Sequence, residues 1–190
     1  MKWILTVSII SLCVACTPDE DIEWDITLIN PKPLWEGDEL MVNAGVDWTP
    51  SPAVLEALEH GISVPIRVTT RVSRHHRWFA TEDRDRNHRF EVRYLPLVRS
   101  YQLTELKTDQ VDSYPRMGML VDALRQPRNW HTGLTRSEVA ERDWQVEIRA
   151  ELDRTRLPSP MRLPVWFNDQ WRAASKWHGW RIDQGGVDEG

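Results

Sequence analysis

Histidines and carboxylates between residues 75 and 88 are the side chains in this sequence best suited to bind a metal ion. The group comprises His75, His76, His88, Asp83 and Asp85. Imidazole and carboxylate are common metal ligands, but adjacent residues of a strand point to opposite faces, so the two neighbouring histidines cannot both face one ion. The same stretch contains four arginines, which repel a cation: Arg77, Arg84, Arg86 and Arg89. We therefore expect an exposed hairpin with solvated charges, and neither a metal site nor a cofactor.

The remaining sequence gives little support for catalysis. It contains no Gly-x-Ser-x-Gly motif, which would present a nucleophilic serine. Two pairs of acids, Asp143 with Glu147 and Glu151 with Asp153, would each share one face of a strand. A glycosidase instead needs two carboxyl groups roughly 5 to 9 Å apart across a cleft. We expect a protein that is not an enzyme and has no catalytic residue.

Arginines on the polar faces of two expected strands are candidates for binding a partner. They are Arg67, Arg71, Arg89, Arg93 and Arg99. Several converging guanidinium groups could bind an acidic protein or anionic lipid headgroups. The alternative, which we favour, is pairing with glutamate and aspartate across strands on a solvated face, where each pair contributes little. Arg67, Arg71 and Arg93 are retained as candidate partner-binding residues.

The tryptophans fall into two groups. Trp24, Trp48 and Trp144 lie on the apolar side of alternating segments and are expected in the core. The C-terminal tryptophans could pack onto the domain, which we favour, or could form a patch that binds a partner or rests on a membrane. Trp171, Trp177 and Trp180 are the candidates for that patch.

The elements that must position these residues are mostly strands. Apolar and polar residues alternate over 22–28, 40–48, 62–72, 90–98 and 144–152. The prolines within residues 30–33 are expected to end the first strand, and residues 81–89 are expected to form a charged turn. Short helices are expected from Ser51 to Gly61 and from Pro115 to Gln126, with a helical turn near 168–175. The pattern predicts a mainly β fold, an antiparallel, immunoglobulin-like β-sandwich with two short helices.

Domain boundaries follow from composition. Residues 22–182 are expected to form a single domain, and the glycine-rich residues 183–190 a disordered tail. The first sixteen residues predict export: Lys2 precedes an apolar run to Ala15, which is shorter than the roughly 20 residues that span a bilayer. Residues 1–15 are expected to be a signal peptide, and residues 16–21 a short acidic tether.

Cys16 is placed to be acylated after cleavage, as in a lipoprotein. The alternative is ordinary cleavage after Ala15, which leaves a free thiol. Cys13 and Cys16 are the only cysteines, so a processed chain has no pair for an internal disulfide. Processing removes Lys2 and takes the formal net charge from −5 to −6 (−5 minus 1), which argues against nucleic acid as a partner. We expect attachment at the periplasmic side of a membrane, with the outer membrane favoured because Thr17 follows the cysteine.

Several motifs in a fixed order resemble a known family. They are residues 57–65 (ALEHGISVP), residues 74–79, Arg93-Tyr94-Leu95 with Tyr101, residues 152–160 (LDxxxLPxP), and Trp171-x-x-x-Ser175-x-Trp177. Over about residues 20–182 the chain resembles the DUF4390 family, proteobacterial exported proteins of unknown function. The resemblance supplies no activity and no catalytic residue. It implies an envelope or signalling context, because genes of the family often lie near that of a two-component sensor kinase.

Three functions remain open from the sequence. The first is a membrane-tethered, non-enzymatic module or scaffold that binds another envelope protein. The second is a periplasmic accessory that modulates a two-component sensor kinase. The third is a carrier of a lipid, glycan or other small ligand, with aromatic side chains stacking in a gap between the sheets.

Overall fold

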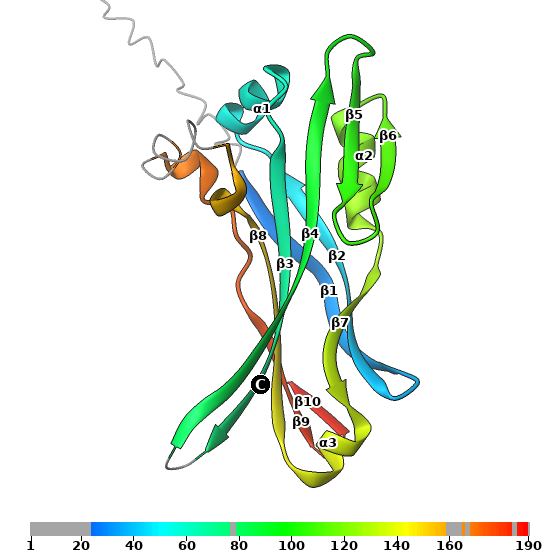
Figure 1. The fold of residues 1–190 in the computed structure, drawn as a ribbon, viewed down its shortest axis with the longest axis vertical. Helices are drawn as coiled ribbons and strands as arrows, with labels where there is room; N and C mark the ends of the chain where they lie inside the picture. The colour runs from blue at the N-terminus through cyan, green and yellow to red at the C-terminus, as the bar shows by residue number, and fades with distance from the viewer. Residues whose placement is uncertain (1–23, 77–78, 159–164, 166–167, 184–185, 190) are drawn as a thin grey trace, which may run out of the picture.

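The fold consists of two antiparallel β-sheets that pack face to face (Figure 1). The computed structural model describes residues 24–76, 79–158, 165, 168–183 and 186–189. The smaller sheet contains β1 (Asp25–Glu36), β2 (Glu39–Thr49) and β7 (Arg128–Thr135), in the order β1-β2-β7. The larger sheet has the order β10-β9-β8-β3-β4-β5-β6. Its strands are β3 (Val64–His76), β4 (Phe79–Leu95), β5 (Ser100–Glu105), β6 (Gln110–Tyr114), β8 (Trp144–Leu152), β9 (His178–Asp183) and β10 (Gly186–Glu189).

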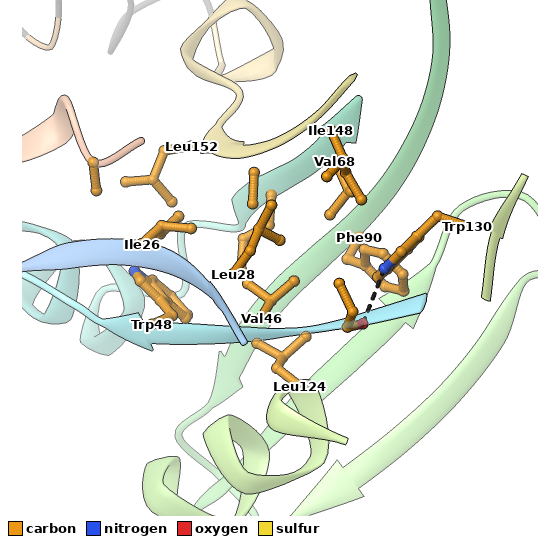
Figure 2. Packing of buried hydrophobic residues seen from close by; sticks show 14 of the residues in the cluster. Ile26, Leu28, Val46, Trp48, Val68, Phe90, Leu124, Trp130, Ile148 and Leu152 are labelled. Carbon is orange, nitrogen blue, oxygen red and sulfur yellow. Dashed lines mark hydrogen bonds between the residues drawn. The ribbon is translucent and has the colours of Figure 1, made fainter. Parts of the chain in front are cut away.

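The core lies between the two sheets. Figure 2 shows Ile26 and Trp48 of the smaller sheet on one side and Val68, Ile148 and Leu152 of the larger sheet on the other. These side chains come from alternate positions of their strands, because successive residues of a strand point to opposite faces. Burial on one face of each sheet is the main stabilisation available to such a fold. The mainly β, two-sheet architecture predicted from the alternation is therefore confirmed; the finer immunoglobulin-like description stays a prediction.

Among the described residues, three short α-helices accompany the sheets, one more than expected. They are α1 (Pro52–Glu59), α2 (Met117–Arg125) and α3 (Arg136–Glu141), and two 3₁₀ turns are present as η1 (Arg154–Arg156) and η2 (Asp169–Trp171). As predicted, the Ser51 hydroxyl caps α1, accepting from the Val54 N–H at 3.2 Å. The unexpected α3 begins with a capping box in which Thr135 and Glu138 satisfy each other's backbone donors.

Helix α2 joins the two sheets at their side. It contacts β2 of the smaller sheet and β5 and β6 of the larger one. Leu120, Val121 and Leu124 are buried along one stripe of the helix. Arg125, in its last turn, pairs with Asp47 of β2 at 2.8 Å. The helix therefore ties β5 and β6, which extend beyond the smaller sheet, to the rest of the molecule.

Strand β1 continues through the prolines that were expected to end it. The register with β2 shifts between Ile29 and Lys32, and Asn30 has φ 45° at that point. β1 is an edge strand, so Pro31 and Pro33 need not donate hydrogen bonds to a second neighbour. The prolines therefore mark a bulge in an edge strand rather than its end.

Residues 81–89, expected as a charged turn, instead belong to β4. β3 and β4 form a long hairpin whose strands pair from Val64 with Val92 to His76 with Phe79. Its far part reaches past the smaller sheet in Figure 1, which explains why polar residues occupy both of its faces. The C-terminal segment also differs from the expected disordered tail of 183–190. Asp183 ends β9, and β10 pairs with β9 from Gly186 with Asp183 to Glu189 with Trp180.

Candidate binding surface

The candidate site lies on the outer face, defined here as the side of the larger sheet turned away from the smaller sheet. In β8 every second residue from Trp144 to Leu152 is buried. The alternate residues are half-buried and belong to the outer face: Gln145, Glu147, Arg149 and Glu151. In the neighbouring β3, Arg67 and Arg71 lie opposite Glu151 and Glu147 in the strand register. The period-two pattern of the sequence thus places acids and arginines in adjacent rows.

Arg67 is held by two acids. Its guanidinium contacts Glu151, with an Nε to Oε1 distance of 3.0 Å, and its Nη1 lies 3.5 Å from Oδ2 of Asp153. Asp153 is only 1% exposed and also lies 3.7 Å from Nε of Arg89. A buried carboxylate needs such partners because its desolvation is costly. Asp153 therefore holds Arg67 and Arg89 together on the outer face.

Arg71 is held by a carboxylate on one side and an aromatic ring on the other. Its Nε and Nη2 donate to the two carboxylate oxygens of Asp85 at 2.8 and 3.1 Å. The hydrogen bond to Asp85, which outweighs desolvation, raises the pKa of Arg71. The guanidinium lies 4.6 Å from the ring centroid of Trp177, and the guanidinium of Arg149 lies 5.7 Å from the same ring. Both distances fall within the range of cation–π attraction.

Arg93, the third arginine candidate, lies at the end of the face near α1. It is exposed, donates to the Ser63 hydroxyl at 2.8 Å and pairs with Glu91 at 3.2 Å. Arg67 and Arg71 thus pair with acids of neighbouring strands, as the favoured alternative predicted, whereas Arg93 pairs with an acid of its own strand. A partner of this face would meet acids and arginines side by side rather than a uniformly basic patch.

A hollow of about 590 Å³ opens beside Arg71 on this face. It is lined by Ser73, Asp143, Trp144, Gln145, Glu147, Gly179, Trp180 and Arg181. Gly179 lies opposite Glu147 in the pairing of β8 with β9, and a Cβ there would be 3.4 Å from Cγ of Glu147. Small residues at 73 and 179 thus leave room between longer neighbours. The volume lies in the range of roughly 300 to 1,000 Å³ usual for ligand sites.

The acids that line the hollow have partners of their own. Asp143 accepts from Nη2 of Arg181 at 2.6 Å, and Glu147 accepts from the Gln145 amide at 3.4 Å. Glu147 also lies opposite Arg71 in the register. The lining therefore offers a carboxylate, a guanidinium, an amide and a hydroxyl to a polar ligand or to a peptide.

The tryptophan candidates separate into core and surface. Trp171 and Trp180 are 3% and 4% exposed and belong to the core cluster, although Trp180 also reaches the lining of the hollow. Only Trp177, half-buried between two arginines, lies on the outer face. Trp48 and Trp144 are buried as expected, but Trp24 is 39% exposed because it precedes β1 at the end of the smaller sheet. In the described residues the buried positions of that alternation begin at Ile26, two residues after Trp24.

A polar cluster between the sheets was not predicted. The carbonyl oxygen of His131 accepts from the Thr70 hydroxyl at 2.7 Å and lies 3.3 Å from Nε2 of His88. Desolvation lowers the pKa of His88, and the bond to His131 only partly opposes it. Burial alone would raise the pKa of Glu39, but hydrogen bonds from His131 and from the Gly133 N–H outweigh it and lower that pKa. The sequence offered no signal for this cluster, because β7 was not predicted as a strand.

The residues that the sequence analysis considered as metal ligands are not brought together among the described residues. His88 faces the inner polar cluster, whereas Asp85 pairs with Arg71 on the outer face. The side chains of His75 and His76 lie outside the described residues. Among the residues that the structure describes, no group of three or more His, Cys, Asp or Glu side chains could hold a metal ion. The lipidation candidate Cys16 also lies outside the described part of the chain.

Comparison with known proteins gives one match. The family model described as "Domain of unknown function (DUF4390)" matches residues 24–181. The match runs from just before β1 into β9, so it covers the smaller sheet and all of the larger sheet except the end of β9 and β10. Neither a curated protein nor a solved structure matches the chain. Within the described residues, none of the helices is long and apolar enough to cross a membrane.

Proposed function

We propose that this chain, which belongs to the DUF4390 family, is an exported, lipid-anchored envelope protein that binds another envelope protein and catalyses no reaction. Cys16 carries the lipid in this proposal, and the outer face of the larger sheet carries the partner. The observation that supports it best is the hollow of about 590 Å³ beside the Arg71–Trp177 pair.

The chemistry of the outer face suits a protein partner. Tryptophan and arginine are the residues most often found among energetically dominant contacts of protein interfaces. Both residue types meet at Trp177, because the guanidinium groups of Arg71 and Arg149 lie against its ring. Paired acids and arginines beside it can exchange hydrogen bonds with a partner and fix its register. A sensor kinase is one partner class that this face could serve, in keeping with the signalling context that the family resemblance implies.

A second candidate function, transport of a small ligand, draws on the same hollow. A polar ligand or glycan could hydrogen-bond to Glu147, Gln145 and Ser73. The hollow lies on the outer face and not in a gap between the sheets, where the sequence placed a carrier site. Native mass spectrometry of the purified chain, with and without release of bound ligands, distinguishes the two functions. A ligand of defined mass at one copy per chain would favour the carrier.

The experiment that tests the protein-binding proposal compares two tryptophans that have similar surroundings. Trp177 lies under Arg71 on the outer face, and Trp35 of β1 lies under Arg136, with 4.4 Å between guanidinium and ring centroid. Tagged full-length chains with Trp177→Ala or Trp35→Ala are captured from crosslinked membranes and quantified by mass spectrometry. The proposal predicts one dominant partner for the unsubstituted chain, lost in Trp177→Ala and retained in Trp35→Ala.

Two results would contradict this proposal. One is an equal recovery of the partner with both variants, which would move the interface away from the outer face. The other is turnover of a substrate by the purified chain that a single substitution in the hollow abolishes. Thermal unfolding of both variants serves as the control, since each substitution also removes a half-buried ring.

A further inference from the structure

The turn between β4 and β5 exposes two large apolar side chains. Leu97 is 101% exposed and Val98 is 67% exposed, the highest fractions among the large apolar residues that the structure describes. Such turns usually carry glycine, proline or short polar residues. Single exposed apolar residues are ordinary, but two adjacent ones at the tip of a hairpin form a small apolar projection.

The hairpin holds this projection in a fixed position. Leu95 pairs with Ser100 at the base of the turn, and the pairing of β4 with β5 continues without a register shift to Phe90 and Glu105. Arg99, the last residue of the turn, has φ 50°, in the left-handed region that a residue with a side chain seldom adopts. The chain is therefore held in a conformation that keeps Leu97 and Val98 at the tip.

The N-terminal end of the domain lies at the same end of the molecule. Asp25, the first residue of β1, pairs with Thr49, which precedes α1, and α1 in turn contacts β4. Figure 1 shows the β4–β5 turn, α1 and the start of β1 toward one end of the long axis, with the β1–β2 turn toward the other. Trp24, immediately before β1, is 39% exposed. Three exposed apolar side chains thus lie at the end where the chain enters the domain.

The length of chain before the domain limits its distance from a membrane. Eight residue steps separate Cys16 from Trp24, and a fully extended chain spans at most ~3.6 Å per residue, about 29 Å in all. A lipid on Cys16 would therefore hold this end of the domain within that distance of the bilayer. The opposite end, with the β1–β2 turn, would point away from it.

We propose that the β4–β5 turn, with Leu97 and Val98 at its tip, is a membrane-contact loop that rests in the headgroup region of the bilayer to which Cys16 is anchored. Transfer of leucine and valine side chains out of water is favourable in free energy. Tryptophan favours the membrane interface, where Trp24 would lie. Arg99, exposed beside the two apolar residues, can remain among the headgroups. This inference rests on the lipid anchor of the proposed function and adds an orientation to it.

The test places a fluorescent probe at each end of the full chain. Leu97→Cys and Asp38→Cys are produced in cells that export and process the protein, and the single introduced thiol is labelled with a nitrobenzoxadiazole probe. Asp38 is an exposed residue of the β1–β2 turn and serves as the matched control. The chains are reconstituted in phosphatidylethanolamine–phosphatidylglycerol vesicles, and the probe is quenched either by doxyl-labelled lipid or by aqueous iodide.

The proposal predicts opposite behaviour at the two positions. The probe at position 97 should show blue-shifted emission, lose emission with doxyl lipid and be protected from iodide, and the probe at position 38 should show the reverse. Quenching of both probes by iodide to the same extent, on protein that stays with the vesicles, would overturn the membrane-contact loop while leaving the anchor intact.

A separate control tests whether Cys16 is acylated. Acylation consumes the Cys16 thiol, so the unsubstituted processed chain should take up no label. Label on that chain would show a free thiol at Cys16 and would contradict the anchor, and the orientation argued from the tether would fall with it. Failure of the membrane-contact loop is therefore detected with the labelled Leu97→Cys and Asp38→Cys chains, and failure of the lipid anchor with the unsubstituted chain.

Discussion

Asp153 is the residue on which the pairing of the outer face depends most. Its carboxylate is 1% exposed, accepts from the Thr155 hydroxyl and lies within 4 Å of Arg67 and Arg89. We predict that Asp153→Ala lowers the free energy of unfolding by about 1 to 3 kcal/mol, because it leaves two arginines without a shared acid. Urea unfolding of the full chain measures the change.

The matched control for Asp153 is Arg93, which is paired on the same face but exposed. Arg93→Ala should change the free energy of unfolding by less than about 1 kcal/mol, since exposed ion pairs contribute little. Equal losses for the two variants would contradict the view that burial of Asp153, rather than the number of ion pairs, decides the stability of this face.

His88 gives the protein a predicted pH dependence. Desolvation lowers its pKa in the folded state below the ordinary value of 6.5. Between that ordinary value and the lower folded value, the unfolded chain binds more protons than the folded chain, so the stability contributed by neutral His88 is complete above pH 6.5 and falls on acidification. We predict a weaker dependence in His88→Phe, which keeps a ring against Trp130.

Unfolding in urea at several values from about pH 5 to pH 7.5 checks the His88 prediction over the range in which a histidine titrates. Parallel stability curves for the unsubstituted chain and His88→Phe would contradict it. The titration of Glu39 does not contribute to the pH dependence of stability in this range. Its pKa is lowered from 4.5, so its contribution is present above pH 4.5 and is lost only at more acidic values.

At the scale of single residues, the pairing of arginines with acids was easier to predict from the sequence than the location of the hollow. The alternation of charges favoured pairing of arginines with acids across strands, because period two alone places them on one face; this holds for Arg67 and Arg71 but not for Arg93, whose partner Glu91 lies on its own strand. The hollow could not be predicted, since it depends on Gly179 and Ser73 lying across β8 from each other. Such proximity requires the strand order, which no local pattern contains.

The contact of α2 with β2 is the most sensitive packing at the scale of elements. A Cβ on Gly45 would lie 2.1 Å from the backbone oxygen of Arg125, so no side chain can be accommodated without moving the helix. We predict that Gly45→Ala destabilises the protein by about 1 to 3 kcal/mol. The denaturant midpoint of the full chain measures this loss.

Gly118, within α2 itself, is the matched control for Gly45. Nothing lies within 4 Å of a Cβ at that position. Gly118→Ala should be neutral or stabilising by up to about 1 kcal/mol, because alanine favours the helix. A loss in Gly118→Ala as large as that in Gly45→Ala would show that the effect comes from the change of residue type and not from the backbone contact.

Elements with a single buried face were predictable, and the others were not. β8 was predicted over its observed range because buried and half-buried residues alternate throughout it. β4 was partly missed because its far part leaves the smaller sheet, so charged residues such as Arg84 and Asp85 occupy both faces. β6 has mostly exposed residues and therefore carries little hydrophobic periodicity.

At the scale of the whole molecule, membrane attachment depends in this account on Cys16. We predict that Cys16→Ser moves the full-length chain from the membrane to the soluble periplasmic fraction, because acyl chains stabilise attachment by about 0.8 kcal/mol per buried CH₂. Fractionation and immunoblotting measure the shift. The Leu97→Asp variant, which should stay on the membrane, is the control, and retention of Cys16→Ser in the membrane fraction would contradict the anchor.

The two-sheet fold could be predicted from the sequence, whereas the site could only be suggested. Alternation over five segments was enough for an antiparallel sandwich, since each such strand must bury one face. Which of the C-terminal tryptophans would be exposed depended on how residues 171–180 pack onto β8, and among Trp171, Trp177 and Trp180 only Trp177 reached the outer face. The family match extends over both sheets but carries no activity.

The most direct test of the central claim is photo-crosslinking in cells from the hollow of the outer face. A photoreactive amino acid replaces Gln145 in one full-length chain and Thr27, an exposed residue of β1 on the smaller sheet, in another. We expect irradiation to link position 145 to one envelope protein and position 27 to give no such product. Crosslinking from position 27 alone, or equally from both positions, would contradict a partner on the outer face of the larger sheet.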